Sequence, residues 1–248
     1  MRRRDYFVLM SIPVCFFAET QVLWVIGQAS IEAKVILVTL LLFSLVAWST
    51  MIYKGMTMSR AKKLDVFFDT EFRNQPAVLD IYDRQLQVDG CPMFSVYQTG
   101  CTELNARLKT TDGRKTRLSI KSIEHIKRSI ENEVARQCIQ LESGLILLAI
   151  AVSGAPFLGL LGTVWGVMET FASVSQPDKD GVVHAELAAM GPGVSAALIT
   201  TVGGLLVAIP SMFAYNWLVH NLRVRTVELD NFAQEMVSKI ETEYLEDE

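Results

Sequence analysis

Three long stretches without charged side chains constrain the fold of this chain more than any other feature. The stretch from Ala33 to Tyr53 has Lys34 as its one charged residue, and residues 144–168 and 187–219 have none. Each is at least as long as the roughly 20 residues that a helix needs to cross the hydrocarbon core of a bilayer. The sequence therefore predicts an all-α membrane protein with three transmembrane helices.

The third stretch is longer than a bilayer requires. As a helix, residues 187–219 would measure about 50 Å, whereas the hydrocarbon core is about 30 Å thick. Tilting accommodates only part of this excess. We therefore expect the helices to continue beyond the membrane and to pack together on one side of it.

The distribution of basic residues predicts which side that is. Lys and Arg residues follow the first stretch, precede the second and follow the third, whereas the connection between the second and third is short and acidic. The positive-inside rule then places the C-terminus in the cytoplasm and the N-terminus on the outer side of the membrane in a multi-pass protein. In chain order, we predict an N-terminal periplasmic or interfacial segment (1–32), a first transmembrane helix (33–53), a cytoplasmic helical region (54–143), a second transmembrane helix (144–174), a periplasmic loop (175–186), a third transmembrane helix (187–220) and a cytoplasmic C-terminal helix (221–248).

The N-terminal segment and the cytoplasmic region carry different signals. An N-terminal Arg2–Arg4 cluster precedes an apolar run that is too short to span a membrane, which favours an interfacial helix over a signal peptide. Between residues 54 and 142, apolar residues recur at helical spacing with charges on the opposite face, which predicts amphipathic helices. The segments VDGCP (88–92) and TTDGRKT (110–116) predict loops between them.

Small residues recur every three or four positions in the second and third apolar stretches, so each predicted helix has a small-residue face along which helices can approach closely. For the glycines, we interpret this pattern as helix packing; they are Gly159, Gly162, Gly166, Gly203 and Gly204. Pro156, Pro192 and Pro210 are predicted to shape or hinge these helices, because each frees a backbone carbonyl.

Hydroxyl and carboxyl groups are the candidates for function. Thr163 and Thr201 are both predicted near the middle of the membrane, and Thr200 adjoins Thr201. Such a hydroxyl either bonds to a carbonyl of its own helix or lines a wet path for protons, and the sequence leaves both possibilities open. Glu169 is the one acidic residue within the second predicted helix, near its outer end, where it is either the mouth of a pathway or an interfacial residue.

Other functional classes find little support. The histidines are dispersed, GLLGTVWG lacks the ending of a phosphate-binding loop, and no nucleophile elbow is present, so an enzyme is not predicted and no catalytic residue is proposed. The four cysteines have no metal-binding spacing, and neither a metal nor another cofactor is expected.

The motifs LGLLGTVWGVMETF (158–171) and PGVSAALITTVGGLLVAIPSMFAYN (192–216) resemble the paired core helices of the MotA/TolQ/ExbB proton-channel family, and are most similar to its ExbB/TolQ branch. The first apolar stretch, within QASIEAKVILVTLLLFSLVAWSTMIYKG (28–55), is also similar to that family's first helix. One departure concerns Ala196, where many members carry Glu after the PG motif.

The resemblance implies a protein of the bacterial inner membrane with its N-terminus in the periplasm. It also implies a homopentamer around a dimer of a single-span ExbD- or TolR-like partner that carries an essential Asp. Protons would be the coupling ion, and a TonB- or TolA-like protein would receive the work. By motif position, Thr163 and Thr201 match the family's pore threonines. No nucleic acid is expected among the partners. Two alternatives are a flagellar-type stator subunit, although that branch typically has four spans, and a structural membrane scaffold that conducts no ions.

Overall fold

The computed structural model describes residues 27, 30–84, 88–110, 113–114, 117–175 and 187–245. The predicted interfacial helix near the N-terminus and nearly all of the predicted loop at 175–186 lie outside these residues. The chain divides into two compact units: unit 1 comprises Met1–Thr50 and Ile146–Ala214, and unit 2 comprises Met51–Leu145 and Tyr215–Glu248. We describe each unit by itself.

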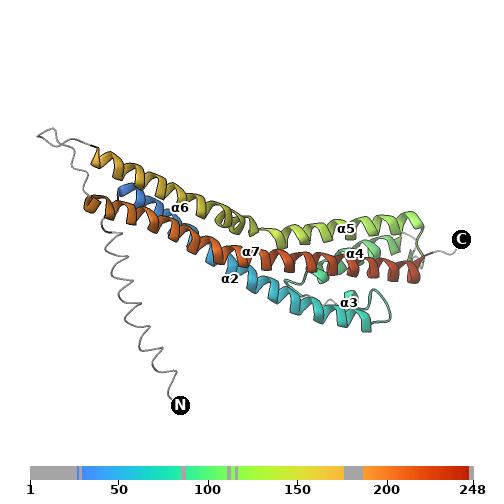
Figure 1. Cartoon of the computed structure of the whole chain (residues 1–248). Coiled ribbons are helices and arrows are strands. Elements are labelled where there is room, and N and C mark those ends of the chain that lie inside the picture. Colours follow the sequence, from blue (N-terminus) through green and yellow to red (C-terminus); the bar gives the residue numbers. More distant parts are fainter. Residues whose placement is uncertain are drawn as a thin grey trace, which may run out of the picture. The chain divides into compact units, whose positions relative to one another are not determined.

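Among the described residues, three helices are long and apolar enough to cross a membrane (Figure 1). They are α2 (Ile31–Asn74), α6 (Leu145–Val174) and α7 (Leu187–Tyr244), of 44, 30 and 58 residues. The prediction of an all-α fold with three transmembrane helices is confirmed. Both α2 and α7 continue without a break past the end of their apolar stretches, so each contributes a segment to both units.

Unit 1 consists of the apolar segments of these three helices. Its apolar side chains are largely on the outside: Val38, Leu41 and Leu45 of α2 are 57%, 60% and 61% exposed. In water such a surface would be strongly unfavourable, whereas lipid tails or neighbouring apolar helices solvate it at no cost. The small residues Ala155, Ala197 and Ala208 lie in the interior instead.

Unit 2 has an ordinary hydrophobic core. It is built by α3 (Asp80–Asp83), α4 (Pro92–Leu108), α5 (Ile120–Glu142) and the polar segments of α2 and α7. The rings of Phe68, Phe72, Tyr97 and Phe232 meet edge to face with centroids 5.1–5.9 Å apart. The helical spacing of α5 explains its place here, because its core residues Ile123, Ile126, Ile130 and Val134 recur on one face.

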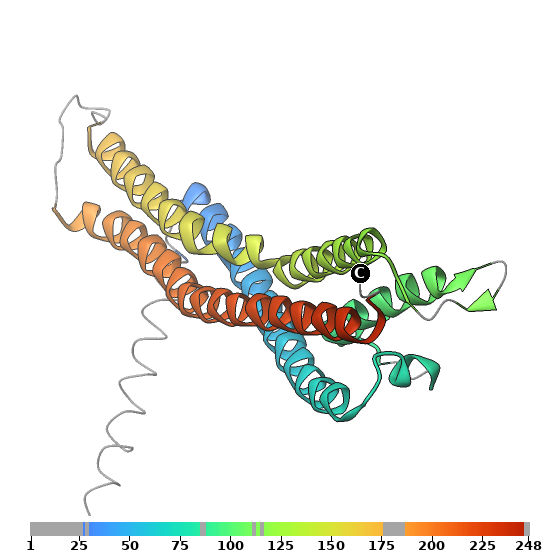
Figure 2. The same cartoon turned by 90° about the vertical axis from the view of Figure 1, so that its right-hand side faces the viewer.

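The connections within unit 2 agree in part with the predicted loops. The VDGCP segment forms a turn in which Gly90 has φ +82°, and α4 begins at Pro92. β1 (Lys109–Thr110) ends at the first residue of the predicted TTDGRKT loop and pairs with β2 (Gly113–Arg114), inside that loop, as a short antiparallel hairpin. The chain then returns as α5 alongside α7 (Figure 2), and the Leu118 N–H donates to the Tyr244 carbonyl at 2.8 Å. Because α5 starts where α7 ends, the two helices are antiparallel.

Lys54 closes the C-terminal end of α5. Its side chain is 6% exposed, and its Nζ donates to the carbonyls of Gln140 and Leu141 at 3.4 and 3.3 Å and to Ser143 Oγ at 3.3 Å. The last carbonyls of a helix have no hydrogen-bond donor within the helix and carry a partial negative charge. An ammonium group there donates hydrogen bonds to them and offsets that charge. Gly144, with φ +83°, then turns the chain into α6.

A buried acidic group connects α2, α4 and α7. Asp65 is 1% exposed and accepts hydrogen bonds from the Cys91 thiol at 3.3 Å and the Met93 N–H at 3.2 Å. Arg225 Nη1 lies 3.7 Å from Asp65 Oδ2 and 2.7 Å from Glu228 Oε2. Burial raises the pKa of Asp65, although these donors and Arg225 oppose the rise.

Candidate functional site

In unit 1, α6 and α7 approach so closely that their backbones touch. A Cβ added at Gly204 would lie 2.5 Å from the Ala155 carbonyl oxygen, and one added at Gly159 would lie 2.9 Å from the Thr200 carbonyl oxygen. At Gly166 it would lie 2.8 Å from Ala197 Cβ, and at Gly162 it would overlap the Thr200 side chain. Four of the five glycines predicted to pack helices therefore lie in this α6–α7 contact.

Gly203 lies on a different side of α7. The nearest atoms to a Cβ built there are the methyl groups of Leu37 and Leu40 on α2, at 3.5 and 3.7 Å, which is ordinary van der Waals contact. The adjacent glycines of the TVGG motif therefore face two different helices. Gly204 allows contact with α6, and Gly203 faces α2.

Thr200 and Thr201 share one acceptor across the contact. Both hydroxyls lie 3.1 Å from the Gly159 carbonyl oxygen, and Thr200 Oγ1 also lies 2.6 Å from the Ala197 carbonyl oxygen of its own helix. Thr200 is fully buried, whereas Thr201 is half-buried. Within this chain Thr200 therefore fills the helix contact, and Thr201 lies at its edge.

Thr163 lies one turn away from this acceptor. Its hydroxyl donates to the Leu160 carbonyl of its own helix at 2.7 Å, and its side chain is half-buried. Thr163 is four residues from Gly159, or about 6 Å along α6, so it and Thr201 lie within about one helical turn of each other in height. Near Thr163 and Thr201, neither α6 nor α7 has an acidic or basic side chain, because residues 145–168 and 187–219 contain no Asp, Glu, Lys, Arg or His.

Glu169 lies in a small pocket among the three helices of unit 1. The pocket has a volume of about 200 Å³, and α2, α6 and α7 all contribute to its lining. Ser30, Glu169, Thr170 and Ser173 supply its polar groups, and Ala196 is also part of its wall. Glu169 is exposed, whereas the buried Thr170 donates to the Gly166 carbonyl at 2.7 Å.

Sequence reasoning identified Glu169 but missed Ser30 and Ser173. Ser30 had a local signal in the sequence, because serine is a preferred N-cap residue. In the structure the Ala33 N–H donates to its hydroxyl at 3.3 Å. Its place in the pocket had no such signal, since that depends on how three helices pack. The prolines lie where expected, with Pro156 inside α6 and Pro192 and Pro210 inside α7, and each helix continues through them. Their predicted hinge role stays a prediction, as do the pathway roles of the threonines and Glu169.

These features define a class of protein: a helical membrane protein whose second and third spans form a glycine-packed pair with hydroxyl groups along it. The family model described as the MotA/TolQ/ExbB proton channel family matches residues 103–231. The Tol-Pal system protein TolQ of Haemophilus influenzae is 31% identical over 227 residues, which cover 89% of this chain and 94% of that protein. TolQ of Pseudomonas aeruginosa is 31% identical over 77% of this chain and 80% of its own length. The biopolymer transport protein ExbB of Neisseria meningitidis serogroup A is 26% identical over 81% of this chain and 88% of its own length.

The chain therefore belongs to the MotA/TolQ/ExbB proton channel family, in its ExbB/TolQ branch. This confirms the resemblance that the core-helix motifs indicated.

Proposed function

We propose that this chain is the pentameric stator subunit of a proton-driven, energy-transducing complex of the Tol-Pal or TonB type in the bacterial inner membrane. Its N-terminus would be periplasmic and its C-terminus cytoplasmic, as the basic residues indicate. Five copies would surround a dimer of an ExbD- or TolR-like single-span protein, and proton flow would do work on a TonB- or TolA-like protein. The names of the relatives and the family membership support this proposal.

One observation carries the mechanism. The level at which Thr163 and Thr201 lie has hydroxyl groups on both helices but no titratable group from either. A hydroxyl can pass a proton along but cannot hold a charge at physiological pH, so a carboxylate has to come from elsewhere. A partner helix that carries an Asp would supply it.

Glu169 is proposed as the mouth of the pathway. It is exposed in a pocket with three hydroxyl-bearing residues, near the outer ends of the spans. Ala196, which stands where many family members carry Glu, lines the same pocket. In this chain the carboxylate of Glu169 on α6 would thus occupy the region that a Glu at position 196 on α7 would otherwise reach.

The test is proton flux through the co-purified complex in liposomes under an imposed membrane potential. Thr163→Val and Thr201→Val keep the shape of the side chain and remove the hydroxyl, so we expect each to preserve assembly and to reduce flux by about tenfold or more. Thr200→Val is the matched control, because Thr200 is fully buried in the helix contact. We expect it to affect stability more than flux. Unchanged flux in both Thr163→Val and Thr201→Val would refute their pathway roles and favour the scaffold alternative.

A further inference from the structure

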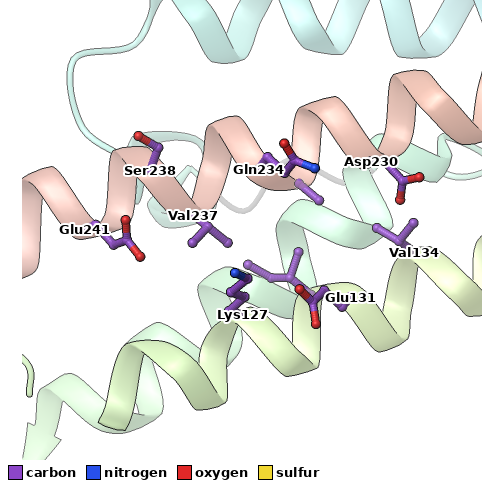
Figure 3. A pocket seen from close by; sticks show the side chains of 10 residues that line it. Lys127, Glu131, Val134, Asp230, Gln234, Val237, Ser238 and Glu241 are labelled. Carbon is purple, nitrogen blue, oxygen red and sulfur yellow. The ribbon is translucent and has the colours of Figure 1, made fainter. Parts of the chain in front are cut away.

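Unit 2 has an open groove between α5 and α7 with a volume of about 400 Å³. Figure 3 shows Lys127 of α5 facing Val237 of α7 across the groove, with Glu241 toward one end and Asp230 toward the other. Glu131 adds a third carboxylate from α5, while Val134 and Val237 form part of an almost fully buried apolar floor. We call this surface the acidic groove.

The charges of the acidic groove are not balanced within the chain. Three carboxylates face one ammonium group, and in the part of the chain that the structure describes, none of these four side chains has an ion pair. Asp230 and Glu241 are eleven residues apart, so the two ends of the groove are about 16 Å apart along α7. The groove thus presents a negative strip over an apolar base.

A matching positive strip lies on the outer face of α5. Its cations are Lys121, Arg128 and Arg136, and His125 lies between the first two. All four are exposed and lie at helical spacing, opposite the core face of α5. Among the described residues, Arg136 is the one member of this group with an ion pair, a long one of 3.7 Å to Glu133. We call these four residues the basic stripe.

From this we infer that the acidic groove of one copy receives the basic stripe of a second copy of the same chain. This rests on the proposed homopentamer and specifies one of its contacts. The two surfaces differ, so the contact is heterologous, and a heterologous contact that closes generates a ring rather than a two-fold dimer.

The register of the two surfaces favours a second copy over an unrelated basic peptide. The groove extends over residues 127–134 of α5, and the centre of the basic stripe, at Arg128, lies within that same stretch. The two surfaces therefore lie at the same level along α5, so a second copy whose α5 is parallel to the first brings stripe and groove together without sliding along the helix.

Cross-linking tests the contact directly. Two differently tagged full-length chains are co-expressed with the small single-span partner, one with Arg128→Cys and the other with Asp230→Cys, both in a Cys15→Ser, Cys138→Ser background. A short bismaleimide should link the two tags in purified complex. The matched control replaces Arg128→Cys with Lys109→Cys, which is exposed but lies outside the basic stripe, and should give no link.

Charge exchange provides the second measurement, by native mass spectrometry at fixed protein concentration. Lys121→Glu with Arg128→Glu should raise the free-protomer fraction roughly tenfold, and adding Asp230→Lys with Glu241→Lys should restore the oligomer.

A wild-type pentamer with neither cross-link nor rescue would overturn this inference and leave the proposed function standing. A cross-link in a wild-type oligomer other than a pentamer would support the contact and refute the stoichiometry. Links from Asp230→Cys only to another protein would also overturn the inference.

Discussion

At the scale of single residues, Gly203 and Gly204 differ in whether the structure has room for one added methyl group. A Cβ at Gly204 meets the carbonyl oxygen of Ala155 at 2.5 Å, and a backbone oxygen cannot move aside without moving its helix. A Cβ at Gly203 meets leucine methyl groups at 3.5 Å or more. The same substitution at two neighbouring positions therefore has different expected costs.

We expect Gly204→Ala to destabilise the protein by about 1–3 kcal/mol, because α6 and α7 have to separate. Gly203→Ala is expected to be neutral or slightly stabilising, since alanine favours a helix more than glycine does. Thermal unfolding of the two purified variants in detergent compares them. Equal melting temperatures would show that α6 and α7 do not touch in the way described.

Asp65 offers a pH prediction at the same scale. Its pKa in the folded state is raised from 3.8, mainly by burial, so the folded protein retains this proton to higher pH than the unfolded chain does. Stability from this group is therefore lost as pH rises from about 3.8 through the folded-state pKa. The asparagine of the Asp65→Asn variant cannot ionise, so that variant does not lose stability in this way as pH rises.

The stability of Asp65→Asn relative to wild type is thus expected to increase as pH rises from about 4 to about 7. Melting temperatures of both proteins across that range measure the difference. The opposite trend would mean that Arg225 stabilises the ionised carboxylate by more than burial disfavours it.

At the scale of helices, Lys54 joins two elements that are far apart in the sequence, since it lies on α2 and binds the last carbonyls of α5. Lys54→Met keeps the aliphatic stem and removes the ammonium group. The buried carbonyls then lose a charged donor, and we expect a loss of about 1–3 kcal/mol. Lys62→Met, at an exposed position on α2, is the matched control. Thermal unfolding that gives equal losses for both variants would contradict the capping role.

The elements themselves were largely predictable, because their signals are local. The lengths of the three apolar stretches predicted α2, α6 and α7 as spans, and the spacing of Ile123, Ile126 and Ile130 predicted a helix where α5 lies.

Contacts between elements were harder to predict from the sequence. The spacing of Cys91 from the other cysteines predicted no partner for it. In the structure its sulfur accepts a hydrogen bond from the Phe94 N–H at the start of α4, and its thiol donates one to Asp65, 26 residues earlier. Burial at that contact raises the pKa of Cys91 to about 12, as expected of a structural thiol.

The candidate site shows the same division. The stripe of small residues predicted a close helix pair, but whether a given residue faces α6, α2 or the edge of the contact depends on helix rotation. The sequence grouped Thr200 with the pathway residues, whereas the structure places its side chain fully inside the contact between α6 and α7. The partners of Glu169 were similarly hidden, because Ser30 is more than 130 positions away.

At the scale of the whole molecule, the chain is expected not to conduct protons by itself. Residues 35–52, 145–168 and 187–219, the apolar interior of the three spans, contain no Asp, Glu, Lys, Arg or His. A proton held at the middle of a bilayer needs a group that can carry it, because the free charge is strongly disfavoured there. Hydroxyls such as Thr163 and Thr201 can relay a proton only when such a group lies beside them.

Liposomes that contain this chain alone should therefore show proton permeability close to that of empty liposomes. Liposomes with the co-purified single-span partner should show a flux that disappears when the partner's membrane Asp is changed to Asn. Glu169→Gln in the complex should reduce that flux without abolishing it, because a mouth raises the local proton concentration rather than carrying the charge across the bilayer. Conduction by the chain alone would mean that hydroxyls and water suffice in its spans, and the partner would then act as a regulator of the pathway rather than as part of it.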